Sequence, residues 1–103
     1  MTQQEVIDLY FEGDRSLYEE YAEACRAQFI VDVEQGDAAC AQAALAAMRH
    51  LAHGLKTLLQ TLGRSDLSEL ARTIEEASVA GDTVTVLEAW SHLRAALPTA
   101  LDD

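Results

Sequence analysis

Residues 45–63 read LAAMRHLAHGLKTLLQTLG and carry the clearest structural signal in the chain. Their large apolar residues recur at steps of three and four, a spacing that lines one face of an α-helix. The members of this stripe are Leu45, Met48, Ala52, Leu55, Leu59 and Leu62. We expect the helix to begin near Ala38 and to end at Gly63, with the stripe packed against other helices.

Helical periodicity also extends to both sides of this stretch. A short helix is expected over residues 3–11 with Thr2 as its cap, and a long one over residues 16–35. Gly36 then fits a C-terminal cap and Asp37 the N-cap of the next helix. The expected inward side chains of the long helix are Leu17, Tyr21, Ala24, Cys25, Phe29 and Val33.

Two further helices are expected after Gly63. One opens at Ser65 or Asp66, and the other lies between the Gly81-Asp82 break and Pro98. Four amphipathic helices joined by short turns pack most simply as an antiparallel up-down bundle. The sequence therefore predicts an all-α fold: a four-helix bundle with an additional short N-terminal helix, forming a single domain over residues 1–103.

Composition narrows the possible functions. The 103 residues carry a formal net charge of −11, which disfavours binding to nucleic acid or to an anionic membrane. No apolar run approaches the roughly 20 residues of a membrane span, and no signal peptide is visible. Cys25 and Cys40 lack a metal or redox spacing and are expected to be reduced thiols. We therefore expect a soluble cytoplasmic protein.

His53 is the candidate functional residue. It lies roughly 130° around the helix from the apolar stripe, so it should face solvent. The same outward strip holds Arg49, Lys56, Thr57 and Gln60.

Charge is distributed unevenly around His53. The chain has 18 acidic residues, yet none falls between Ala38 and Ser65, and Lys56 is the only lysine. A phosphoryl group would meet cations and no carboxylate on this helix. The simpler alternative is a helix that is merely rich in Ala and Leu. Gly54 also stands out, because a glycine inside a helix lowers helix stability. Its missing side chain would let another protein approach closely; the alternative is that it is a defect that the helix tolerates.

The run from His53 to Gly63 resembles the signature of histidine-containing phosphotransfer (HPt) domains. That signature has a leucine two residues after the histidine, a lysine three after it, and a Leu-Gly pair nine and ten after it. The matching positions here are Leu55, Lys56, Leu62 and Gly63. The segment 67–77 and the Ala80-Gly81-Asp82 turn are also similar to the family, so the resemblance covers residues 48–97.

The resemblance implies a monomeric phosphocarrier in a two-component phosphorelay, without kinase activity of its own. His53 would accept a phosphoryl group from an aspartyl phosphate on a response-regulator receiver domain, or on a hybrid sensor kinase, and pass it to another receiver. Lys56 would stabilise the phosphoryl group. Gln60 is one turn further along the helix, and helix geometry rather than the family pattern suggests it as a hydrogen-bonding neighbour. The protein would need no cofactor or metal, because the receiver supplies Mg²⁺.

The receiver would dock around His53. The residues expected to contact it are Arg49, His50, Gly54 and Thr57. Thr57 departs from the family, which usually has glycine or another small residue directly after the lysine. Gly54 leaves space on the neighbouring face.

Other functions remain open at this point. A degenerate family member would bind a receiver without being phosphorylated, although both His53 and Lys56 are present. His50 and His53 are spaced to share a metal, but no carboxylate lies near them on the helix. A dimeric kinase-type bundle would normally have an acidic residue where Gly54 stands. No convincing Ser/His/Asp or paired-carboxylate site suggests a hydrolase.

Overall fold

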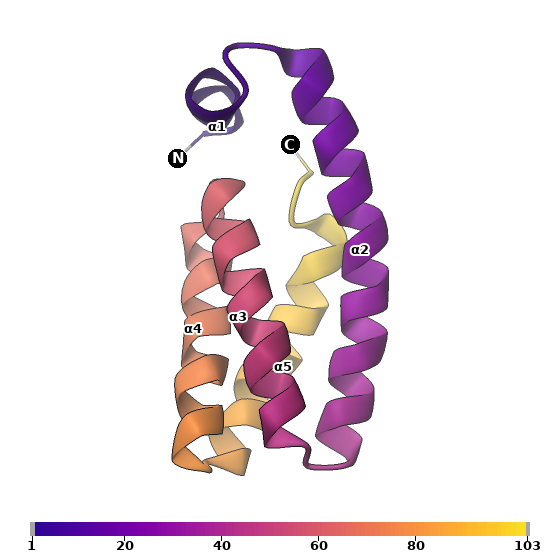
Figure 1. The fold of residues 1–103 in the computed structure, drawn as a ribbon, viewed down its shortest axis with the longest axis vertical. Coiled ribbons are helices and arrows are strands. Elements are labelled where there is room, and N and C mark those ends of the chain that lie inside the picture. Colours follow the sequence, from indigo (N-terminus) through magenta and orange to yellow (C-terminus); the bar gives the residue numbers. More distant parts are fainter. Residues whose placement is uncertain (1, 103) are drawn as a thin grey trace.

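A computed structural model describes residues 2–102, which form five α-helices and a short terminal 3-10 helix and contain no strand. Figure 1 shows the longer helices packed lengthwise and the short N-terminal helix lying across one end. The molecule measures 42 × 21 × 19 Å. The elements are α1 (Gln3–Tyr10), α2 (Arg15–Ala41), α3 (Leu45–Thr61), α4 (Ser65–Ala80), α5 (Thr83–Ala96) and η1 (Leu97–Thr99). The all-α prediction is confirmed.

Side-chain caps start three of the helices. Thr2 and Glu5 form the reciprocal capping box of α1, in which each side chain bonds the other residue's backbone N–H. Asp14 accepts a hydrogen bond from the backbone N–H of Leu17 at 3.0 Å, and Asp82 caps α5 in the same way. The interruption expected between residues 11 and 16 and the break expected at residues 81–82 are therefore confirmed.

The predicted break at Gly36-Asp37 is wrong, because α2 continues without interruption to Ala41. Gly36 lies inside the helix, where the Trp90 ring of α5 packs directly against its backbone. Asp37 accepts hydrogen bonds from Trp90 Nε1 at 2.9 Å and from Arg94. Both residues thus serve contacts between helices, which local sequence rules do not detect.

The turn between α2 and α3 lies later than expected, at residues 42–44. Ala43 adopts a left-handed conformation with φ of 51°, a conformation that glycine would favour. Consequently α3 begins at Leu45 rather than Ala38, and Cys40 belongs to α2.

The core confirms the stripe of α3. Met48, Ala52, Leu55, Leu59 and Leu62 are buried together with residues from every other helix, and Leu45 is partly buried against them. On α2 the prediction is half right: Cys25 and Phe29 are buried and Val33 is partly buried, but the inward residues predicted before Cys25 face solvent. The exposed residues there are Leu17, Tyr21 and Ala24, whereas Tyr18 and Ala22 are buried, and the Tyr18 ring meets Phe11 edge to face.

Figure 1 shows α2 running the length of the molecule, with α1 and the C-terminus at the same end. Packing is most extensive between α3 and α4 and next between α4 and α5. Arg64 and Arg26 donate hydrogen bonds to the carbonyls of Ala100 and Leu101, which fixes the C-terminal segment at this end. Within residues 2–102, none of the helices has both the length and the apolar character needed to cross a membrane.

Candidate functional site

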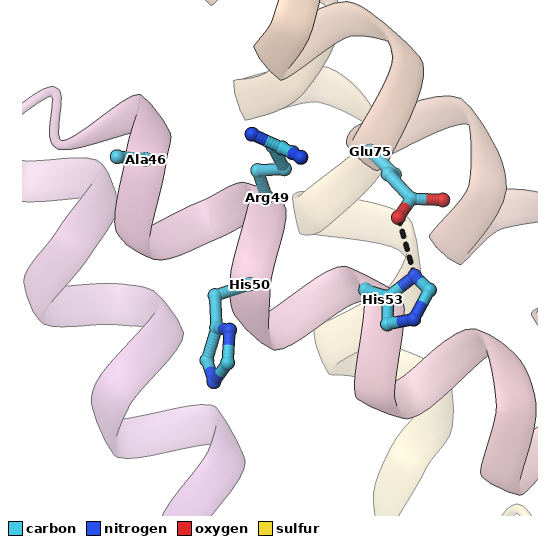
Figure 2. Close-up of a pocket in the computed structure, with 5 residues that line it drawn as sticks. All are labelled: Ala46, Arg49, His50, His53 and Glu75. Atoms are coloured by element: carbon cyan, nitrogen blue, oxygen red, sulfur yellow. Dashed lines mark hydrogen bonds and ion pairs between the residues drawn. The ribbon is translucent and has the colours of Figure 1, made fainter.

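His53 lies on the outer face of α3, as predicted, and its side chain is 65% exposed. Its ring is oriented by a contact between Nδ1 and Oε2 of Glu75 on α4, which lie 2.6 Å apart. Figure 2 shows the carboxylate of Glu75 reaching this nitrogen from the neighbouring helix. The opposite ring nitrogen, Nε2, is therefore the one presented away from Glu75.

Lys56 reaches the same carboxylate. Its Nζ donates to Oε1 of Glu75 at 2.6 Å, so that one carboxylate joins the histidine to the lysine one turn further along. The Lys56 and Glu75 side chains are 29% and 18% exposed. Ser68 Oγ of α4 donates to the carbonyl of Lys56 at 2.8 Å, and this bond fixes the register of the two helices beside the site.

The positive charge of Lys56 favours the ionised form of Glu75. The hydrogen bond from the Lys56 ammonium is the main cause that lowers the pKa of Glu75, with a smaller contribution from His53. Glu75 is therefore an anion at neutral pH and accepts at both oxygens. A neutral His53 ring must then carry its proton on Nδ1, which leaves the lone pair on Nε2.

Glu75 corrects one expectation. The sequence suggested an exposed histidine with no carboxylate nearby, and that holds along α3 alone. The acidic residue comes from α4, packed antiparallel beside α3, and was not among the predicted site residues. A signal existed in the hairpin: Gly63 lies at the turn, with His53 ten residues before it and Glu75 twelve after it. Residues at similar distances from a tight turn meet across an antiparallel helix pair.

A surface depression of about 380 Å³ adjoins His53. It is lined by Ala46, Arg49, His50, His53 and Glu75, so two of the predicted docking residues share the depression with the histidine. In Figure 2 the His50 ring points away from Glu75. Arg49 makes no ion pair within residues 2–102, whereas the other five arginines and Lys56 each pair with an acidic side chain.

The remaining predicted residues flank this centre on two sides. Thr57 and Gln60 line a second depression together with Lys56, and Gln60 makes no hydrogen bond to His53. Thr57 instead donates to the carbonyl of His53 at 3.3 Å, within its own helix. Gly54 faces α2 on the other side, where a β-carbon added to it would have no atom within 4 Å.

Residues 2–102 contain no group of three or more His, Cys, Asp or Glu side chains placed to bind a metal ion. Cys25 and Cys40 are free thiols. Burial is the main cause that raises the pKa of both, so neither is an activated thiolate.

The site thus consists of an exposed imidazole, a carboxylate that holds one of its nitrogens, and a lysine held by the same carboxylate.

Comparisons of the chain with protein families, with curated proteins and with solved structures gave no match.

Proposed function

We propose that this protein is a histidine phosphotransfer protein that accepts and donates a phosphoryl group at Nε2 of His53. The observation that carries the proposal is the arrangement of His53, Glu75 and Lys56, in which one ring nitrogen is held and the other is presented outward. The architecture proposed with it is an antiparallel up-down four-helix bundle of α2 to α5, to which α1 is added.

The chemistry needs one bond to form and one to break. The Nε2 lone pair attacks the phosphorus of an aspartyl phosphate, and the N–P bond forms as the P–O bond to the aspartate breaks. The aspartate leaves as a carboxylate, and the imidazole becomes a phosphorylated cation that retains its Nδ1 proton. Glu75, 2.6 Å from Nδ1, stabilises the positive charge that develops on the ring. The reverse reaction returns the phosphoryl group to a second receiver.

Lys56 supplies positive charge for the negatively charged phosphoryl oxygens. Its ammonium lies on the same face of α3 as His53 and is held near the ring by Glu75, from where it can approach the phosphoryl oxygens. Positioning and charge stabilisation account for most catalysis of phosphoryl transfer, so an accessory nucleophile or base is not required. In this proposal the receiver brings the acidic residues and Mg²⁺, and the protein acts as a cytoplasmic monomer.

Transfer from phosphorylated receivers tests the proposal. The purified protein should take up an acid-labile, alkali-stable phosphoryl group from at least one receiver domain of the source organism. His53→Gln should abolish the label while the far-ultraviolet circular dichroism stays unchanged, because this side chain is largely exposed. Binding of a receiver without any label would instead identify a non-phosphorylated adaptor.

Glu75 gives a second test with a matched control. Glu75→Gln removes the charge that stabilises the cationic ring, and labelling should slow by about tenfold or more. Glu76→Gln, on the next residue of α4, removes a charge whose one ion pair within residues 2–102 is with Arg72, and it should leave the rate unchanged. Equal rates for the two variants would remove Glu75 from the mechanism.

A further inference from the structure

A groove separates α2 from α3 on the side of Gly54. Its volume is about 330 Å³, and His50 lines both this groove and the depression beside His53. The α3 wall is mostly apolar, with Leu51, Leu55 and Leu58, whereas α2 contributes only polar side chains, among them Asp32. The groove is therefore a partly apolar surface that continues directly from the proposed phosphorylation site.

Asp32 is unusual among the acidic residues of the chain because it is only 6% exposed. Its Oδ1 accepts one hydrogen bond, from Gln28 Nε2 at 3.0 Å, and no cation within residues 2–102 forms an ion pair with it. Burial raises the pKa of this carboxyl, and the bond from Gln28 only partly opposes that effect. A buried carboxylate without a cation lowers the stability of the free protein.

We propose that the groove between α2 and α3 binds a basic side chain, lysine or arginine, that the docking receiver domain carries on an apolar segment, and that Asp32 is its ion-pair partner. This inference rests on the proposed function. It assigns Asp32 to recognition of the receiver, and not to the transfer step at His53.

Position and charge both favour a receiver as the occupant. A receiver that reaches Nε2 of His53 must cover the surface next to it, and Gly54 presents no side chain between His53 and the groove. Asp32 is the one formally charged side chain among the groove residues, since the others are glutamines, His50, Gly54 and leucines. The apolar wall can pack against the methylene stem of a long basic side chain, while its charged end meets the carboxylate.

Asp32→Asn tests this inference, because asparagine keeps the shape and the acceptor for Gln28 but removes the charge. The matched control is Glu34→Gln, an exposed acid two residues along the same helix. For a receiver that exchanges phosphate with the wild type, Asp32→Asn should raise Kd by about tenfold or more, and Glu34→Gln should change it less than about twofold. The salt dependence of Kd should also become weaker in Asp32→Asn.

Two further measurements separate recognition from folding and chemistry. The thermal midpoint of Asp32→Asn should equal or exceed that of the wild type, since a buried charge is removed. Labelling of His53 by phosphoramidate, which needs no docking partner, should be unchanged. An unaltered Kd for Asp32→Asn, or a loss of thermal stability that accounts for its weaker binding, would overturn the inference about the groove. Either result would leave the proposed phosphoryl transfer at His53 intact. A wild-type protein that neither binds nor exchanges phosphate with any receiver would overturn both proposals.

Discussion

The two glycines inside helices, Gly36 of α2 and Gly54 of α3, have opposite surroundings. A β-carbon on Gly36 would lie 2.0 Å from Cζ2 of Trp90, in the middle of the packed helices. On Gly54 the same atom would meet nothing within 4 Å. A glycine in a helix costs roughly 1 kcal/mol relative to alanine, so each position needs a reason.

The two glycines are explained in different ways. Gly36 is explained within the chain, because the indole ring of α5 occupies the space where a side chain would begin. No contact among the residues that the structure describes requires a glycine at Gly54, which borders the groove beside the exposed histidine. We infer that the first glycine serves the fold and the second serves a surface contacted by a partner. Substitutions at and around the two sites separate these roles.

The largest effect is expected at Gly36. Gly36→Ala should lower the free energy of unfolding by about 3 kcal/mol, because the added methyl overlaps Trp90 and either α2 or α5 must shift. Chemical denaturation measures the loss. A double-mutant cycle with Trp90→Phe, whose smaller ring frees space, should show that the two changes are not additive. Strict additivity would mean that the overlap with Trp90 is not the cause.

Asp37, next to Gly36, should have the second largest effect. Asp37→Ala removes the acceptor of the buried Trp90 Nε1–H and the partner of Arg94, with an expected loss of about 2 kcal/mol. The exposed pair Arg15–Glu19 gives the control, since Glu19→Ala should cost at most about 0.5 kcal/mol. Similar losses for both variants would contradict a structural role for Asp37.

The lowered pKa of Asp37 also predicts how the free energy of unfolding depends on pH. The hydrogen bonds from Arg94, and next from Trp90, hold the pKa of Asp37 below its ordinary value of about 3.9. The depressed pKa means that its stabilising effect is complete above that ordinary value and is lost as the pH falls through the folded-state pKa. Below about pH 4 the stability gap between wild type and Asp37→Ala should therefore narrow. A gap that stays constant down to pH 2 would show that charge contributes nothing.

Gly36 and Asp37 also show what the sequence could not reveal. A Gly-Asp pair between apolar segments is typical of a helix break, and only the contact with Trp90, 54 residues later, explains why the helix continues. The true turn at residues 42–44 has no glycine, and Ala43 takes the left-handed conformation without a local signal. The long-range packing of α2 therefore overrides its local sequence pattern.

The α3 region was predictable for the opposite reason. Its stripe depends only on the helical period, so the burial of Met48 and Leu59 and the exposure of His53 follow from spacing within one element. Glu75 escaped prediction because its place beside His53 depends on the register between α3 and α4. That register is fixed by core packing and by the bond from Ser68 to the backbone of Lys56.

The smallest effect on stability is expected at Gly54, and its sign is reversed. Gly54→Ala should raise the free energy of unfolding by up to about 1 kcal/mol, because alanine favours the helix and its methyl meets no neighbour. Ala43→Gly is the matched control: it relieves the left-handed strain and should stabilise by a similar 0.5 to 1 kcal/mol, roughly. Denaturation in urea measures both variants.

Only docking should distinguish these two variants. If a receiver approaches α3 closely at Gly54, then Gly54→Ala should weaken receiver binding and Gly54→Leu should weaken it further, while both leave phosphoramidate labelling of His53 intact. Ala43→Gly should bind the receiver as the wild type does, although it is stabilised to the same extent. Because stability rises in both cases, a loss of binding confined to Gly54 cannot come from damage to the fold. Full binding by Gly54→Leu would instead mean that Gly54 is a defect that the helix tolerates. Gly36, by contrast, is required by its contact with Trp90.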